Sequence, residues 1–227
     1  MAALHANIER ELATSGLPSV ILRPGMFAAN TLHWWAPQIR AGDEVRWPYG
    51  AVETAPIDER DIAAVAVRAL SEASLAGGDY VLTGPAALSH ARQVAVIGEV
   101  LGRRLAFHEL SPEDFRRETA ASWPPPVVDM LLAAWGAAVG HPAYVTTAVA
   151  DLTGAPARSV RDWVAAHADS FRKVGPVGRY RTIVEQQRAS VERSASRRRL
   201  AARPTHQDDE MRRPATTGWS SKVSSPG

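Results

Sequence analysis

Residues 15–30, SGLPSVILRPGMFAAN, decide the fold of this chain. Gly16 and Pro18 predict the end of a helix, because glycine often follows the last helical residue and proline does not continue a helix. The branched residues after Pro18 predict a short buried strand over 19–22. The loop that begins at Arg23 leads into a second helix. The stretch therefore predicts helix, strand and helix in succession, which is the repeating unit of an α/β sheet.

The same alternation continues to about residue 110, and helices dominate after it. We therefore predict an α/β fold: a Rossmann-like doubly wound parallel sheet lacking its N-terminal strands, with a small, mostly helical C-terminal lobe. The sheet domain would span 1–110, the helical substrate-side lobe 111–171 and a tail 172–227. Helices are predicted over 2–15, 27–39, 62–73, 89–102 and 127–138, from Ser111 onward, and from Ser159 to Phe171. Strands are predicted over 19–22, 80–83 and 104–109. Extended chain is predicted over 51–57.

The tail differs from the rest of the chain in charge. Residues 172–227 carry 13 Lys and Arg against 5 Asp and Glu, a net charge of +8, which leaves −6 for residues 1–171. Few apolar residues lie in this tail, so we predict that it is mostly disordered. Its only aromatic residues are Tyr180 and Trp219. A solvated tail is therefore favoured over a nucleic-acid-binding segment.

Composition excludes several classes of protein and site. The chain has no cysteine, so thiolate nucleophiles and Cys-ligated zinc are excluded. His108, His141 and His167 lack the spacing of metal ligands, and no metal is predicted. No apolar run approaches the roughly 18 residues of a membrane helix, and the N-terminus lacks the features of a signal peptide. A cytoplasmic location and no membrane contact are therefore expected.

Four sequence segments occur in an order typical of one family. Together they resemble the NmrA-like NAD(P)H-binding family of atypical short-chain dehydrogenase/reductases. The resemblance implies NAD(P)H as cofactor and hydride transfer to a small carbonyl or quinone-like substrate. A non-catalytic NAD(P)-sensing regulator that acts through a protein partner is the alternative. The segments are Ser15-Gly16-Leu17 with Leu22-Arg23-Pro24 and Asn30, then Asp61-Ile62-Ala63, Tyr80-Val81-Leu82-Thr83-Gly84-Pro85 and Leu101-Gly102-Arg103.

The chain departs from this family at its beginning. The family starts with a strand and a Gly-rich turn, whose backbone N–H groups hold the cofactor diphosphate. None of the 16 glycines here forms a G-x-G-x-x-G motif. We expect about three βα units, or roughly 90 residues, to be missing. The chain would then be the C-terminal portion of such a protein, with impaired cofactor binding and activity.

The loop after the first strand supplies the candidate site. Arg23, Pro24, Gly25 and Phe27 follow the carboxyl end of a strand, where doubly wound sheets bind ligands. The resemblance implies that this loop faces the cofactor. The alternative is a structural turn, in which proline fixes φ and glycine allows a close approach.

Substrate contacts are predicted at Asn30 and Trp34. Asn30 follows the loop, and Trp34, Trp35 and Trp47 together would line a pocket for an apolar or aromatic molecule. Packing of the three indoles in the protein core is the alternative, and the favoured one.

No catalytic residue is identified from the sequence. The Tyr-x-x-x-Lys pair of typical short-chain dehydrogenases is absent, because lysine occurs only at 173 and 222. His5 would be a substitute acid, although a surface pair with Glu9 one turn away is favoured. Asp58 and Asp61 suggest paired carboxylates, but capping of the following helix explains both better.

Overall fold

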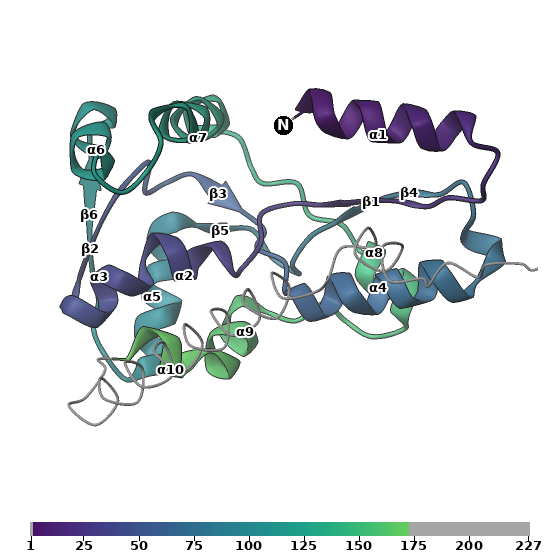
Figure 1. Cartoon of the computed structure of the whole chain (residues 1–227). Helices are drawn as coiled ribbons and strands as arrows, with labels where there is room; N and C mark the ends of the chain where they lie inside the picture. The colour runs from purple at the N-terminus through teal and green to yellow at the C-terminus, as the bar shows by residue number, and fades with distance from the viewer. Residues whose placement is uncertain (1, 173–227) are drawn as a thin grey trace, which may run out of the picture. The chain divides into compact units, whose positions relative to one another are not determined.

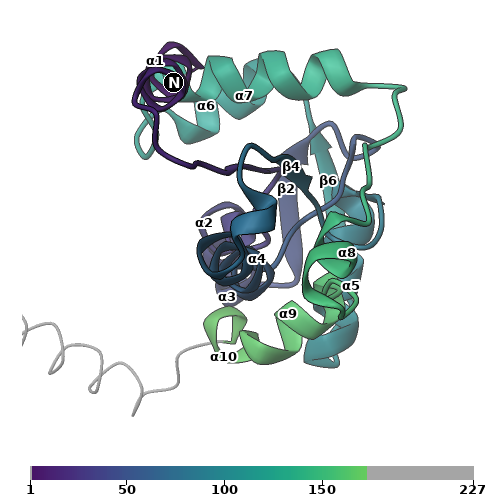
Figure 2. The same ribbon diagram turned by 90° about the vertical axis from the view of Figure 1, so that its right-hand side faces the viewer.

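The computed structural model describes residues 2–172, which belong to one unit (Figures 1 and 2). All but Arg172 of the predicted tail 172–227 lies outside the described residues. The elements are, in order, α1 (Ala2–Thr14), β1 (Ile21–Pro24), α2 (Asn30–Trp34), α3 (Ala36–Ala41), β2 (Glu44–Pro48), β3 (Glu53–Thr54), α4 (Glu59–Ser71), the 3₁₀ helix η1 (Ala73–Leu75), β4 (Asp79–Leu82), β5 (Leu88–Ser89), α5 (His90–Leu101), β6 (Ala106–Leu110), α6 (Pro112–Thr119), α7 (Pro125–Ala138), α8 (Ala148–Thr153), α9 (Val160–Ala166) and α10 (Ala168–Phe171).

The pair β1–β4 confirms the predicted α/β class. The two strands are parallel, from Ile21 opposite Asp79 to Pro24 opposite Leu82. α1 lies on one face of the pair and α4 on the other (Figure 1). Helices on both faces of parallel strands define a doubly wound arrangement. The chain therefore has the Rossmann-like architecture that its sequence predicts.

A second parallel pair, β2–β6, was not fully predicted. β6 was expected, but its partner β2 was not, although an alternating pattern marks β2. Val45 and Trp47 are buried, whereas Glu44 and Arg46 are exposed. Two repeats of this exposed and buried alternation are too short a pattern to predict a strand from the sequence. Residues 44–48 form a strand because they pair with the distant β6. A short antiparallel pair, β3–β5, lies in the same part of the fold.

Most of the predicted helix starts are confirmed by their caps. The hydroxyl groups of Ser89, Ser111 and Ser159 accept backbone N–H bonds at the starts of α5, α6 and α9. Asp58 does the same for α4. These bonds satisfy N–H groups that the helix itself leaves without partners. Gly102 ends α5 in the left-handed conformation that glycine adopts without strain.

Some boundaries differ from the prediction. The helix predicted over 27–39 is two helices, α2 and α3, because Pro37 lacks the N–H that a continuous helix needs and its ring clashes with the preceding turn. The strand predicted over 19–22 is shifted to β1, since ladder pairing with β4 begins at Ile21. Helices dominate after β6, as predicted, but α8 was not expected and the last predicted helix divides at His167.

The buried residues form two clusters. The smaller one lies around β4 and α4 and contains Ile57, Val65, Leu82 and Val149. The larger one joins α2, α3, β2 and α5 to the C-terminal helices, and tryptophan is its most frequent large residue. Its bulkiest fully buried members are Trp35, Ile39, Ile97, Phe115, Trp163 and Phe171. The C-terminal helices therefore complete the core of the same unit rather than lying apart from it.

Candidate active site

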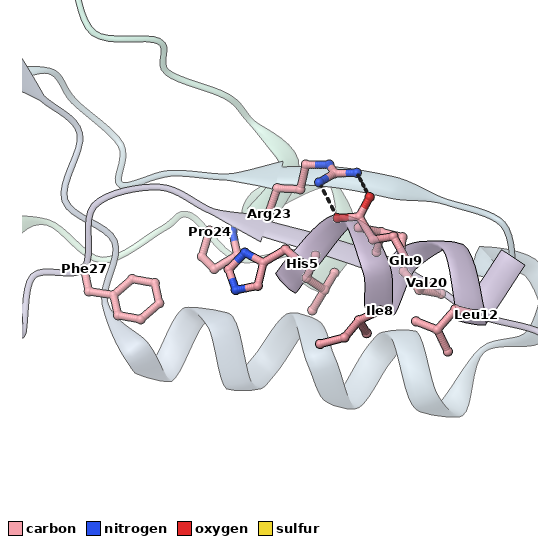
Figure 3. A pocket seen from close by; sticks show the side chains of 10 residues that line it. His5, Ile8, Glu9, Leu12, Val20, Arg23, Pro24 and Phe27 are labelled. Atoms are coloured by element: carbon pink, nitrogen blue, oxygen red, sulfur yellow. Dashed lines mark hydrogen bonds and ion pairs between the residues drawn. The ribbon is translucent and has the colours of Figure 1, made fainter. Parts of the chain in front are cut away.

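A groove runs along β1 on the side that faces α1 (Figure 3). It encloses about 460 Å³. His5, Pro24 and Phe27 line one end of it, and Leu12 and Val20 line the other (Figure 3). In the part of the chain that the structure describes, β1 pairs only with β4, and the groove lies between β1 and α1. Three of the predicted cofactor-binding residues, Arg23, Pro24 and Phe27, therefore share one hollow.

Arg23 is held by two carboxylates. Its Nη1 and Nη2 atoms each donate to one oxygen of Glu9 at 2.8 Å, and its Nε atom donates to Asp79 at 2.8 Å. The hydrogen bonds that Arg23 donates to Glu9 raise the pKa of Arg23 and lower the pKa of Glu9. The guanidinium thus ties α1 to the β1–β4 pair. The three side chains together carry one net negative charge. The contribution of Asp79 was not predicted, because no local pattern links it to Arg23, 56 positions earlier in the chain.

The loop after β1 is fixed through its backbone. The N–H of Gly25 donates to the carbonyl of Leu82 at 2.9 Å, which extends the β1–β4 pairing by one step. Phe27 forms an isolated parallel bridge with Ile57. The side chain of Phe27 nevertheless stays 41% exposed at the mouth of the groove. The loop is therefore a rigid turn that presents an aromatic side chain, and the structural and ligand-binding interpretations are compatible.

The two predicted substrate residues lie apart. Asn30 is half-buried at the first position of α2, next to the loop, but it does not line the groove. Trp34 lies at the other end of α2, where it is 8% exposed and borders a different hollow. Trp34, Trp35 and Trp47 do come together, with ring centroids 5.6 to 6.1 Å apart.

The paired carboxylates of α4 have structural partners. Asp58 accepts the N–H of Arg60 at 2.8 Å as a helix cap. Burial raises the pKa of Asp58, but the bonds from the side chain and backbone of Arg60 outweigh it and hold this pKa below its ordinary value. Asp61 accepts the N–H of Arg158 at 2.7 Å and pairs with its guanidinium. Asp58 therefore caps α4 as predicted, whereas Asp61, for which capping was also predicted, instead joins α4 to the segment before α9.

His90 is a buried histidine that the sequence did not single out. It is fully buried among the rings of Trp34, Trp35 and Trp135, 5.3 to 6.4 Å away. Burial lowers the pKa of His90 to about 4. Its Nε2 atom has no hydrogen-bond partner within the described chain. The ring is therefore neutral near pH 7 and packs as part of the aromatic core.

Residues 2–172 hold neither a metal-binding cluster nor a membrane-spanning helix. These residues contain no group of three or more His, Asp or Glu side chains placed to hold a metal ion. Among them, no helix has both the length and the apolar character needed to cross a membrane.

No protein-family model matches the chain. The chain is 43% identical over 164 residues to the (4-alkanoyl-5-oxo-2,5-dihydrofuran-3-yl)methyl phosphate reductase of Streptomyces griseus, a match that covers 72% of this chain and 58% of the relative. It is 32% identical over 167 residues to an NAD(P)H azoreductase of Xenophilus azovorans, covering 72% of this chain and 57% of that relative. The chain thus spans a little over half the length of these relatives.

A solved structure shows the same fold. The NADPH-dependent quinone oxidoreductase of Escherichia coli superimposes with a TM-score of 0.63 and 27% identity, over 74% of this chain and 61% of that one. The same enzyme has also been crystallised with NADPH. These matches confirm the resemblance to the NmrA-like NAD(P)H-binding family that the sequence segments imply.

Proposed function

We propose that this chain is part of an NAD(P)H-dependent reductase of a small carbonyl or quinone-like substrate, and that the nicotinamide end of the cofactor occupies the groove beside β1. The position of the groove carries the proposal. It reaches the carboxyl end of β1, next to the end of β4, and ligands of doubly wound sheets bind at this edge. The similarity to reductases supports the same reaction class.

The residues of the groove fit a nicotinamide ring better than a phosphate. Pro24 and Phe27 offer apolar surface to a flat ring. Arg23 is paired with Glu9 and Asp79, so the local charge is negative and would repel a diphosphate. When bound, NAD(P)H would supply the hydride. Pro24 and Phe27 would border the ring, Gly25 would fix the turn between them through its bond to Leu82, and Arg23 would hold α1 against the strand.

The substrate side of the site is proposed at Asn30. This residue begins α2 directly after the loop, and its backbone N–H donates to the carbonyl of Phe27 at 3.1 Å. An amide can donate a hydrogen bond to a carbonyl oxygen and orient it. The 227 residues contain no G-x-G-x-x-G motif. We therefore propose that these residues alone bind NAD(P)H weakly.

The test is a thermal melt of the chain with increasing NADPH, followed by NADPH oxidation with a panel of quinones and aldehydes. A ligand that binds only the native state raises the melting temperature. A free ligand concentration of ten times the dissociation constant adds about 1.4 kcal/mol to the free energy of unfolding. Phe27→Ala should remove most of this rise. Val67→Ala, which also truncates an exposed apolar residue but lies on α4 away from the groove, should keep it. Equal shifts for the two variants would contradict the placement of the cofactor.

One observation favours the non-catalytic sensor as a second candidate. The ion pair with Arg23 holds the pKa of Glu9 low, so this carboxyl is not a proton donor near pH 7. His5 is then the one remaining titratable side chain of the groove besides the Arg23 pair. A rise in melting temperature with NADPH but no oxidation of NADPH by any substrate of the panel would favour the sensor. Oxidation that is lost in His5→Ala would favour the reductase.

A further inference from the structure

A second hollow lies between α2, α3, β2 and α6. It encloses about 380 Å³. Four aromatic side chains, Trp34, Trp47, Phe115 and Trp123, line it, and we call it the aromatic pocket. None of its lining residues lines the groove beside β1. The aromatic pocket is therefore a separate site, and its function is not explained by the proposed position of the cofactor.

The floor of the aromatic pocket is a rigid set of rings. Trp34 and Trp47 are stacked with centroids 5.6 Å apart, and Phe115 meets Trp47 edge-on at 4.8 Å. Trp47 and Phe115 are almost completely buried. Trp123 lies in the segment that follows α6 and is half-buried. Its ring centroid is 6.1 Å from that of Trp47. Because the buried rings hold one another in place, the floor exists before any ligand binds.

The rim of the aromatic pocket is polar but electrically balanced. Arg46 donates from Nη2 to Glu118 at 2.6 Å and from Nε at 3.2 Å. The side-chain amide of Gln38 bonds to the backbone of Arg46 in both directions. Its Oε1 atom accepts the N–H at 2.8 Å, and its Nε2 atom donates to the carbonyl at 3.2 Å. The ion pair raises the pKa of Arg46 and lowers the pKa of Glu118, so both stay charged near pH 7. An ionic ligand would have to compete with this pair, whereas an uncharged ligand would not.

We propose that the aromatic pocket binds a planar, uncharged aromatic molecule, stacked against the half-buried ring of Trp123 above the floor that Trp34 and Trp47 form. Protein interiors are packed with few voids larger than a water molecule, so a hollow of this size over an aromatic floor is not a packing defect. Its volume falls within the range of small-molecule sites, and aromatic lining with a few polar groups is typical of them. Aromatic pairs gain stability beyond their buried area, which selects a flat ring over a saturated one. This inference goes beyond the proposed function and needs no dinucleotide.

The experiment titrates the full 227-residue chain, without NADPH, with coumarin as the planar uncharged probe. Binding is followed by ligand-observed NMR and by the quenching of tryptophan fluorescence. Cyclohexanone, which is uncharged but not planar or aromatic, is the matched probe. Saturable binding of coumarin, and roughly 2- to 10-fold weaker binding of cyclohexanone, is expected from the energy of aromatic pairs. Equal binding of the two probes, or no saturable binding of coumarin, would overturn the proposal.

Three variants locate the bound coumarin. Trp123→Ala removes one wall, and roughly 10-fold weaker binding is expected. Ser122→Phe fills the pocket from an exposed position of its lining, and it should block binding without removing any core side chain. Tyr144→Ala truncates an aromatic residue that is 71% exposed and outside the pocket, and it should leave binding unchanged. Binding that survives in Ser122→Phe, or that is lost in Tyr144→Ala, would show that coumarin binds elsewhere.

Discussion

The buried His90 should make the stability of the chain depend on pH. The folded-state pKa of His90 is about 4, because burial disfavours the charged ring. It lies at the first position of α5, where the helix dipole also disfavours a positive charge. In the unfolded chain a histidine has a pKa of about 6.5. The unfolded state therefore binds a proton first as the pH falls, and the folded state is destabilised relative to it.

The sign and size of the effect follow from this difference. The contribution of neutral His90 is complete above pH 6.5 and is lost as the pH falls from 6.5 toward 4. Each pH unit in this window costs about 1.4 kcal/mol, so about 2 kcal/mol should be lost between pH 7.5 and pH 5. The loss at pH 4 would approach about 3 kcal/mol. Carboxylates with lowered pKa values, such as Asp58, act at lower pH in the same direction.

The assay is urea unfolding at a series of pH values, compared between the wild type and His90→Phe. The variant keeps a flat ring in the aromatic core but has no group that titrates. We expect the free energy of unfolding of this variant to change by less than about 0.5 kcal/mol from pH 7.5 to pH 5, because its unfolded state no longer binds the proton that the folded state excludes. Gln93→Met is the matched control, because Gln93 is also fully buried on α5 and does not titrate. This control should keep the slope of the wild type.

One result would refute the reasoning. The three indoles around His90 can also stabilise a cation through their faces. If that attraction offsets the cost of burial, the wild type and His90→Phe will show the same pH dependence. The folded-state pKa of His90 would then lie near its unfolded value, and burial would not be the dominant cause.

Two further predictions concern single contacts. Gly84→Ala should lower the melting temperature by several degrees, because a Cβ atom at this position would lie 2.1 Å from the carbonyl oxygen of Pro56 and neither backbone can move freely. A melting temperature within about 1 °C of the wild type would contradict this. Asp61→Ala should lower the free energy of unfolding in urea by about 2–4 kcal/mol, because it leaves the N–H and guanidinium of Arg158 without their buried partner. The control Asp129→Ala breaks an exposed ion pair and should have little effect. Equal losses for the two variants would show that burial does not decide the cost.

The features that the sequence predicts well are those decided within a few residues. Ser89, Ser111 and Ser159 each accept a bond from a backbone N–H three residues later, so their role depends only on local geometry. Gly102 likewise ends a helix through its own φ angle. The predicted starts of α5, α6 and α9 are therefore confirmed by contacts that the sequence itself contains.

The features that the sequence does not predict depend on distant partners. β2 becomes a strand because it pairs with β6 about 60 positions later, and its own alternating residues are too few to show this. Arg23 lies in a predicted cofactor loop, but its charge is taken up by Glu9 and Asp79, 14 and 56 positions away. The aromatic pocket likewise combines residues from α2, β2 and α6, which only the folded chain brings together.

The charges around the two hollows argue for different ligands in each. The groove beside β1 carries the net negative charge of Arg23 with Glu9 and Asp79, which suits the uncharged or positively charged nicotinamide ring and not a phosphate. The aromatic pocket has the balanced pair of Arg46 and Glu118 at its rim, which favours neither sign of charge. Because the hollows share no lining residue, occupation of one does not block the other sterically. Coumarin affinity should therefore be the same with and without NADPH, and competition between the two ligands would mean that one of the two sites is misplaced.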